Sequence, residues 1–245
     1  MDEAARYRLL LLHYSGGGVS MYAEWPAWLP SDIGVQRVQL PGRQDRADEL
    51  PFTELNPLLD ALADVVDTGH DERPYALFGH SMGALLAYRF AVAQRGSGGR
   101  APALLGVAGW APVGFAEIGA DPAARSDESI IDDVRGLGSM PSAALNDREL
   151  RTLLVPAMRA DLAVCASHVD DGAVVGCPIA VYSGRDDPLV APAAMRVWRD
   201  RTERYLGNRV FPGGHMFIHD HGLAIATDLA HLVHTHASVG AGVTE

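Results

Sequence analysis

Short apolar runs alternate along the chain with longer segments that have helical periodicity. Between residues 55 and 66, leucines and a valine recur at three- and four-residue spacing, which predicts an amphipathic helix. Residues 84–93, 190–205 and 217–235 also have helical patterns. Strands that alternate with helices indicate an α/β domain with a mostly parallel sheet. The apolar runs that predict buried strands are residues 8–14, 35–40, 75–78, 104–110, 179–183 and 209–211.

Residues 113–176 interrupt this alternation. No apolar run in the stretch is a convincing strand, and residues 129–137, 147–158 and 160–168 have helical patterns separated by turns. A helical insertion between two strands of the sheet is the simplest interpretation. We therefore expect one domain over residues 1–245 that contains this insertion.

The composition is that of an ordinary globular protein, with 48% hydrophobic and 21% charged residues in a chain of 245. The net charge of −11 disfavours nucleic acid or an acidic lipid surface as a partner. No apolar run reaches the ~18 residues that a membrane span needs, so we expect a soluble, cytoplasmic protein. Two cysteines, Cys165 and Cys177, do not make a disulfide framework, and we expect both to be reduced and buried.

The segment Gly79-His80-Ser81-Met82-Gly83 carries the strongest chemical signal. It matches the G-x-S-x-G pattern, follows a predicted strand and begins a predicted helix, which is the context of a nucleophile elbow. The two glycines allow a sharp turn and close helix packing without a clash. Ser81 would then lie at the carboxyl end of the sheet, where the helix N-terminus and the Met82 N–H face a developing oxyanion.

A serine nucleophile needs a base that an acid orients, and in an α/β-hydrolase the chain order is Ser, then Asp or Glu, then His. Asp186 and Asp187 both follow the predicted strand of residues 179–183, and the local pattern leaves either as the acid. His215 follows the predicted strand of residues 209–211 in a glycine-rich loop, and it is the candidate base.

Other histidines fit the role of base less well, because they precede the serine, adjoin it or fall in predicted helices. A metal site is the alternative use of so many histidines, but no second cluster of His, Cys or Asp has the spacing of zinc ligands. We therefore expect no metal. The competing histidines are His13, His70, His80, His168, His219 and His221.

The turn Ser15-Gly16-Gly17-Gly18 follows the first predicted strand. In α/β-hydrolases a backbone N–H from the loop after an early strand is the second oxyanion donor, and Ser15 is the best candidate here. A glycine-rich phosphate loop is the alternative. The chain lacks the G-x-x-x-x-G-K-[ST] pattern and has no lysine, which argues against that alternative.

With these residues in place, nearly the whole chain resembles the type II, or editing, thioesterases of polyketide synthases and non-ribosomal peptide synthetases, in the α/β-hydrolase superfamily. G-x-S-x-G alone indicates only a serine hydrolase, whereas the L-P-G-R and R-A-D segments make the resemblance more specific. The matching segments are Tyr14–Gly17, Leu40–Arg43, Gly79–Gly83, Arg159–Asp161, Asp187-Pro188 and Phe211–His215.

The resemblance implies an α/β-hydrolase core with a helical lid over residues 113–176. It implies hydrolysis of acyl thioesters on the phosphopantetheine arm of an acyl or peptidyl carrier protein, which clears stalled or misloaded acyl groups. It favours Asp187 over Asp186, because the acid of that family directly precedes a proline. The implied site is Ser81 as nucleophile, His215 as base and Asp187 as acid, with the backbone N–H groups of Ser15 and Met82 as the oxyanion hole.

No cofactor is implied, because the phosphopantetheine belongs to the partner, and we expect a monomer. Arg148, Arg151 and Arg159 in the insertion are candidate contacts for an acidic carrier protein. Three alternatives remain open, since a fold does not fix a function. They are an off-loading thioesterase, a small-molecule esterase or acyltransferase on the same scaffold, and a non-catalytic protein that only binds a carrier.

Overall fold

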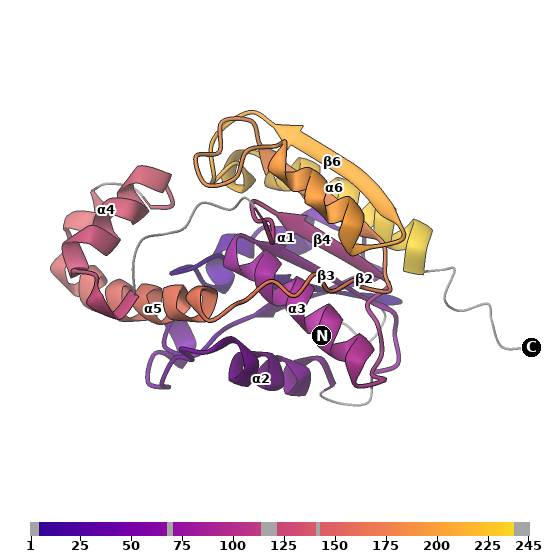
Figure 1. Ribbon diagram of the computed structural model, residues 1–245, viewed down its shortest axis with the longest axis horizontal. Coiled ribbons are helices and arrows are strands. Elements are labelled where there is room, and N and C mark those ends of the chain that lie inside the picture. Colours follow the sequence, from indigo (N-terminus) through magenta and orange to yellow (C-terminus); the bar gives the residue numbers. More distant parts are fainter. Residues whose placement is uncertain (1–4, 68–70, 114–121, 141–142, 238–245) are drawn as a thin grey trace, which may run out of the picture.

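The computed structural model describes residues 5–67, 71–113, 122–140 and 143–237. At its centre is a six-stranded sheet in the order β2-β1-β3-β4-β5-β6, with every neighbouring pair parallel (Figure 1). Each strand overlaps an apolar run of the sequence, and the predicted α/β class is confirmed. The strands are β1 (Tyr7–Leu12), β2 (Ile33–Val38), β3 (Tyr75–His80), β4 (Leu104–Ala108), β5 (Ile179–Gly184) and β6 (Tyr205–Phe211).

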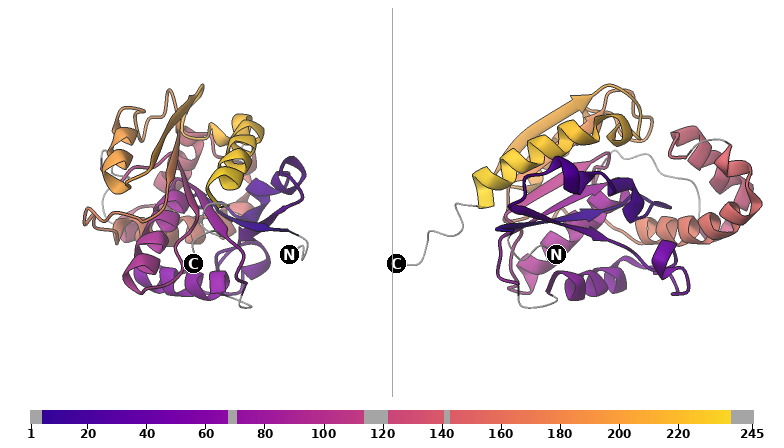
Figure 2. Two further views of the ribbon diagram at one scale, coloured as in Figure 1. Left: turned by 90° about the vertical axis from the view of Figure 1, so that its right-hand side faces the viewer. Right: turned by 180° about the vertical axis from the view of Figure 1, so that it is seen from behind.

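Helices cover both faces of the sheet, and the left view of Figure 2 shows α6 and α3 on opposite sides. Alternate side chains of a strand point to opposite faces. Leu10 and Leu12 of β1 therefore join one core cluster and Leu9 and Leu11 the other. Burial of both faces explains why β1 is apolar except at Arg8. One face packs against α2 (Leu55–Asp67) and α3 (Met82–Gly96), and the other against α1 (Trp25–Trp28) and α6 (Ile218–Ala237).

Two α-helices, α4 (Asp127–Leu137) and α5 (Arg148–Ala166), lie between β4 and β5 in the chain. They stand at the end of the sheet toward which the strands point (Figure 1). Ser126 and Asp147 cap their N-termini by accepting hydrogen bonds from backbone N–H groups of the first turn. The two helices share a small core of their own, made of Ile130, Ile131, Val134, Leu145, Leu154, Val155, Met158 and Leu162.

The insertion differs from expectation in one respect. The two helices predicted for residues 147–158 and 160–168 are a single helix, α5, with Pro156 inside it. A proline removes one backbone donor and leaves the carbonyl four residues earlier, that of Thr152, without its helical partner. Thr152 and Pro156 both lie on the exposed side of α5, where water can bond that carbonyl.

The segment before β6 also differs. A helix is predicted for residues 190–205, but only Ala194–Arg201 is helical, in the tighter 3₁₀ form, and Tyr205 already pairs with Ile179 of β5. Pro192 has no N–H to offer a longer helix at its start. None of the helices in the described part of the chain is long and apolar enough to cross a membrane.

Candidate active site

Ser81 occupies a sharp turn between β3 and α3. Its φ of 55° and ψ of −120° lie outside the favoured regions for a residue with a side chain, so the turn is strained. The Ser81 N–H donates to the Ala108 carbonyl at 2.8 Å, which ties the turn to the end of β4. Gly79 and Gly83, which flank this turn, have no room for a side chain. A Cβ on Gly79 would lie 2.0 Å from the Gly83 carbonyl oxygen, and one on Gly83 would lie 2.2 Å from that of Leu12.

Ser81, His215 and Asp187 form a hydrogen-bonded row at the carboxyl end of the sheet. The distance from His215 Nε2 to Ser81 Oγ is 2.9 Å, and that from His215 Nδ1 to Asp187 Oδ2 is 2.8 Å. Asp187 can only accept when ionised, so Nδ1 carries the ring proton and Nε2 is free to accept from the serine hydroxyl. All three residues are buried. The arrangement is that of a nucleophile, a base and an orienting acid.

The geometry separates the two candidate acids. Asp187 has a fully buried side chain, and its second oxygen accepts from the Leu189 N–H at 2.8 Å. Asp186 is exposed, and its backbone N–H donates to the Gly213 carbonyl at 3.0 Å. The structure therefore joins Asp187, and not its neighbour, to His215.

The competing histidines do not occupy the position of His215. His80 is fully buried with its ring centroid 5.1 Å from that of His215, and burial lowers its pKa well below 6.5. His219 lies in α6, and His70 lies outside the described residues. Among the described residues, no group of three or more His, Cys, Asp or Glu could hold a metal ion.

The turn that carries Ser15, the second predicted oxyanion donor, follows a strand that lies next to the Ser81 turn. Gly83, at the start of α3, lies directly against Leu12 at the end of β1, because a Cβ on Gly83 would be only 2.2 Å from the Leu12 carbonyl oxygen. The chain segment that leads from β1 to Ser15 therefore begins beside the start of α3. Met82 is the first residue of α3, where backbone N–H groups have no partner inside the helix. In the part of the chain that the structure describes, neither the Ser15 N–H nor the Met82 N–H donates to a loop carbonyl.

A cavity of about 420 Å³ adjoins this segment. The glycines Gly16, Gly17 and Gly18 line one side of it. Leu150 and Leu154 of α5 also line it and contribute apolar surface. The space suits an apolar group better than a charged one.

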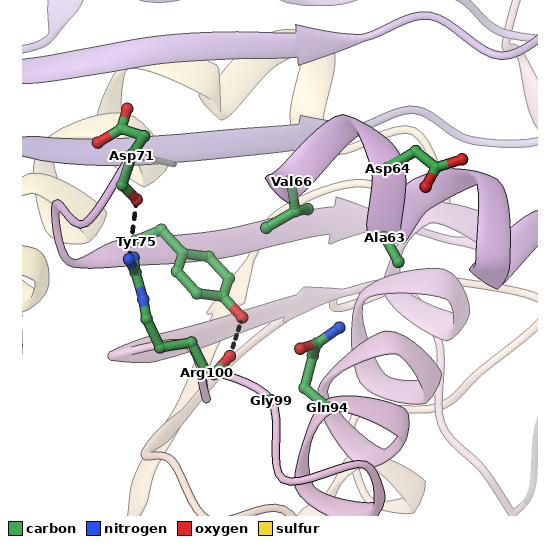
Figure 3. Close-up of a pocket in the computed structure, with 8 residues that line it drawn as sticks. All are labelled: Ala63, Asp64, Val66, Asp71, Tyr75, Gln94, Gly99 and Arg100. Carbon is green, nitrogen blue, oxygen red and sulfur yellow. Dashed lines mark hydrogen bonds between the residues drawn. The ribbon is translucent and has the colours of Figure 1, made fainter. Parts of the chain in front are cut away.

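A second cavity, of about 270 Å³, lies at the amino ends of the strands, where β3 begins (Figure 3). Its polar groups are bonded to one another. The Tyr75 hydroxyl donates to the Arg100 carbonyl at 2.5 Å, and the Arg100 guanidinium donates to the Asp71 carbonyl at 2.8 Å. The Arg73 guanidinium, which donates to the Asp71 carboxylate, holds the pKa of that carboxyl down at about 2. These bonds tie the start of β3 to the loops before β3 and before β4.

The family follows from comparison of this chain with known proteins. The profile of the thioesterase domain family matches residues 7–235. The chain belongs to this family. It is therefore a thioesterase, a hydrolase, and the parallel sheet with its flanking helices is the α/β-hydrolase fold that the sequence predicted.

Relatives resemble this thioesterase over most of their length. The gramicidin S biosynthesis protein GrsT of Aneurinibacillus migulanus is 33% identical over 90% of this chain and 86% of its own. RedJ, the thioesterase from the prodiginine pathway of Streptomyces coelicolor, is 34% identical with a TM-score of 0.84, over 94% of this chain and 86% of that one. BorB, the type II thioesterase from the borrelidin cluster, is 31% identical with a TM-score of 0.82, over 95% and 94%.

Proposed function

We propose that this thioesterase clears stalled or misloaded acyl groups from the phosphopantetheine arm of acyl or peptidyl carrier proteins in a polyketide or non-ribosomal peptide system. The hydrogen-bonded row of Ser81, His215 and Asp187 carries the proposal, because it supplies the groups that thioester hydrolysis needs. The similarity to type II thioesterases over nearly the whole chain supports the class of substrate.

The proposed reaction has two steps. Ser81 Oγ attacks the thioester carbonyl while His215 Nε2 takes its proton, and the pantetheine thiol leaves with that proton. Water, activated by the same nitrogen, then hydrolyses the acyl ester on Ser81 and releases the free acid. The backbone N–H groups of Ser15 and Met82 stabilise the oxyanion in both steps. Neither a cofactor nor a metal takes part, and the protein acts as a monomer in the cytoplasm.

The role of Asp187 as the acid gives a specific expectation. Asp187→Asn removes the charge that holds the Nδ1–H tautomer of His215, so kcat should fall by roughly 10⁴-fold. Asp186→Asn is the matched control, because it makes the same change one residue earlier on an exposed side chain. Steady-state hydrolysis of an acetyl thioester measures both variants. A crippled Asp186→Asn with an active Asp187→Asn would show that the other carboxylate is the acid.

The insertion is proposed as a lid that shapes the acyl chamber. Leu154 is 7% exposed and lines the cavity of about 420 Å³ beside the Gly16–Gly18 turn. Leu154→Trp should fill part of that space and shift kcat/KM toward shorter acyl groups, while p-nitrophenyl acetate hydrolysis is largely kept. Thr152→Trp, on the exposed side of the same helix, is the control. A chain-length profile in Leu154→Trp that matches the wild type would mean that α5 is only additional core.

The candidate docking arginines of the insertion differ in their surroundings. Arg151 pairs with Glu128 at 2.5 Å and Arg159 pairs with Asp127 at 2.7 Å, so their charges are balanced within the insertion. Arg148 is exposed, and no ion pair involves it among the described residues. We therefore assign the contact with an acidic carrier to Arg148 first.

Turnover of matched substrates tests the proposal. The same acyl group is presented on a phosphopantetheinyl carrier protein, on coenzyme A and as a p-nitrophenyl ester, and kcat/KM should be highest on the carrier. Higher kcat/KM on the free ester would indicate a small-molecule esterase, and transfer to an alcohol or amine would indicate an acyltransferase. Release of only full-length chains would indicate off-loading. Failure of Ser81 to react with a fluorophosphonate would leave a protein that binds without catalysis.

A further inference from the structure

Two segments that make the family resemblance specific, L-P-G-R and R-A-D, meet in a buried ion pair. Arg43 Nη1 lies 2.5 Å from Asp161 Oδ2, and Arg43 Nη2 lies 2.7 Å from Asp161 Oδ1. The side chains are 7% and 2% exposed. This two-pronged contact joins the loop after β2 to the lid helix α5. None of the proposed chemical steps uses either residue.

The same carboxylate also holds the turn that carries Ser15. Asp161 Oδ2 accepts from the Gly16 N–H at 2.8 Å, and Arg43 Nη1 donates to the Gly17 carbonyl at 3.4 Å. The pair therefore contacts the Ser15–Gly16 peptide through Asp161 and the Gly17–Gly18 peptide through Arg43. Its two members come from segments 118 residues apart, and they converge on one turn.

The turn itself fixes the direction of the Ser15 N–H. The Gly17 N–H donates to the Tyr14 carbonyl at 2.9 Å, and Gly16 has a φ of +72°, as in a type II turn. The Tyr14 carbonyl and the Ser15 N–H belong to one planar trans peptide and point in opposite directions. Groups that fix the Tyr14 carbonyl and keep the turn in the type II form therefore also fix the direction of the Ser15 N–H.

His13 provides a second hold on that carbonyl. Burial, and next the charge of Arg43, lower the pKa of His13 to about 4, so the ring is neutral near pH 7. Its Nδ1 lies 2.9 Å from the Tyr14 oxygen, which can only accept, so Nδ1 carries the proton. The Tyr14–Ser15 peptide is thus held by two donors, and the next peptide by Asp161.

Several residues along the inner face of α5 contact the Tyr14–Gly17 turn. A Cβ on Gly16 would lie 2.8 Å from Met158 Sδ and 3.3 Å from Leu154 Cδ1, so the turn packs directly on the helix. One turn beyond Asp161, Cys165 Sγ lies 3.9 Å from Ser15 Oγ. A shift of α5 would therefore move the turn with it.

A buried ion pair is weak evidence for a purely stabilising role, because well-packed apolar side chains of similar volume are often as stable. Here the carboxylate has a specific use, since an apolar residue could not accept from Gly16. We propose that Asp161 and Arg43 are positioning residues that hold the Tyr14–Gly17 turn with the Ser15 N–H directed at the oxyanion, and that couple it to the lid helix. The inference rests on the proposed hydrolysis at Ser81.

The test is hydrolysis of p-nitrophenyl acetate by the full chain. A fluorophosphonate, allowed to react to completion, gives the concentration of active sites, and kcat is calculated per active site. Asp161→Asn should lower kcat by roughly 10–100-fold, which does not exceed the effect on kcat of removing an oxyanion donor altogether. KM should stay within about twofold of the wild-type value. A merely structural role would lower Tm or the titrated fraction and leave kcat per site unchanged.

Two further variants make the test decisive. Asp170→Asn disrupts another partly buried ion pair, with Arg201 at 2.6 Å, in the segment that follows α5, and should lower Tm alone. The double variant Arg43→Met/Asp161→Leu leaves no unpaired buried charge and should fold, yet lose kcat like Asp161→Asn. Wild-type kcat per site in the double variant would overturn the inference, whether or not Asp161→Asn folds. A wild-type protein that neither reacts with the probe nor hydrolyses the ester would instead overturn the proposed function.

Discussion

Replacement of Ser81 by Ala is expected to lower kcat for thioester hydrolysis by roughly 10⁴–10⁶-fold while the protein stays folded. Ser81 Oγ lies 2.9 Å from His215 Nε2, so alanine at this position removes the hydroxyl that the base would activate. Ser97→Ala is the matched control, because Ser81 and Ser97 flank the two ends of α3. It should leave kcat unchanged. Single-turnover hydrolysis of an acyl carrier protein, with circular dichroism for folding, measures both.

His215→Ala should have an effect of similar size, because an unactivated serine is a poor nucleophile. Residues that act as a unit are not additive, so the double variant Ser81→Ala/His215→Ala should be no slower than either single variant. Near-wild-type turnover in Ser81→Ala would rule out the serine mechanism. A double variant that is slower than both single variants by the product of their effects would show that the two residues act independently.

The sheet could be predicted because its strands are buried on both faces. A strand such as β1 is then apolar except at the buried Arg8, and the glycine-rich turn that follows it marks its end. The edge strand β6 was harder, since its residues are only partly buried and Tyr205–Asn208 have no continuous apolar pattern. Its pairing with β5, and not local pattern, makes those residues a strand.

The candidate site was predictable where local sequence carries the chemistry. Ser81 and His215 each stand in a glycine-rich turn after a strand, and the structure brings them within hydrogen-bond distance. The choice between Asp186 and Asp187 was not predictable from local pattern, because it depends on which side chain turns inward beneath His215. Their roles in catalysis stay predictions that the variants above test.

The contact between Arg43 and Asp161 was not predicted, although both segments were recognised as matching a family. Side chains 118 residues apart meet only through the tertiary packing of α5 against the loop after β2. A buried arginine beside a buried aspartate leaves no periodic signal in either segment. His13 was likewise judged only as a candidate base, whereas its ring holds the peptide before Ser15.

The second large expected effect is a loss of folding stability when Gly83 is replaced by Ala, which adds a single methyl group. Gly83→Ala would place a Cβ 2.2 Å from the Leu12 carbonyl oxygen and 2.8 Å from that of His13. Both obstacles are backbone, so α3 or the end of β1 must move. We expect the free energy of unfolding to fall by about 3 kcal/mol, the upper part of the range for overpacking, with loss of activity as the Ser81 turn shifts.

Gly96→Ala provides the matched control, because Gly96 ends the same helix and a Cβ there meets nothing within 4 Å. That variant should be as stable as the wild type or more stable by up to about 1 kcal/mol, since alanine favours a helix over glycine. Urea unfolding gives the free energy for all three proteins, and the p-nitrophenyl acetate assay gives activity. A Gly83→Ala protein as stable as Gly96→Ala would mean that α3 can withdraw from β1 at no cost. Retained activity in that protein would further mean that the close approach of Gly83 to β1 is not needed to aim Ser81 at His215.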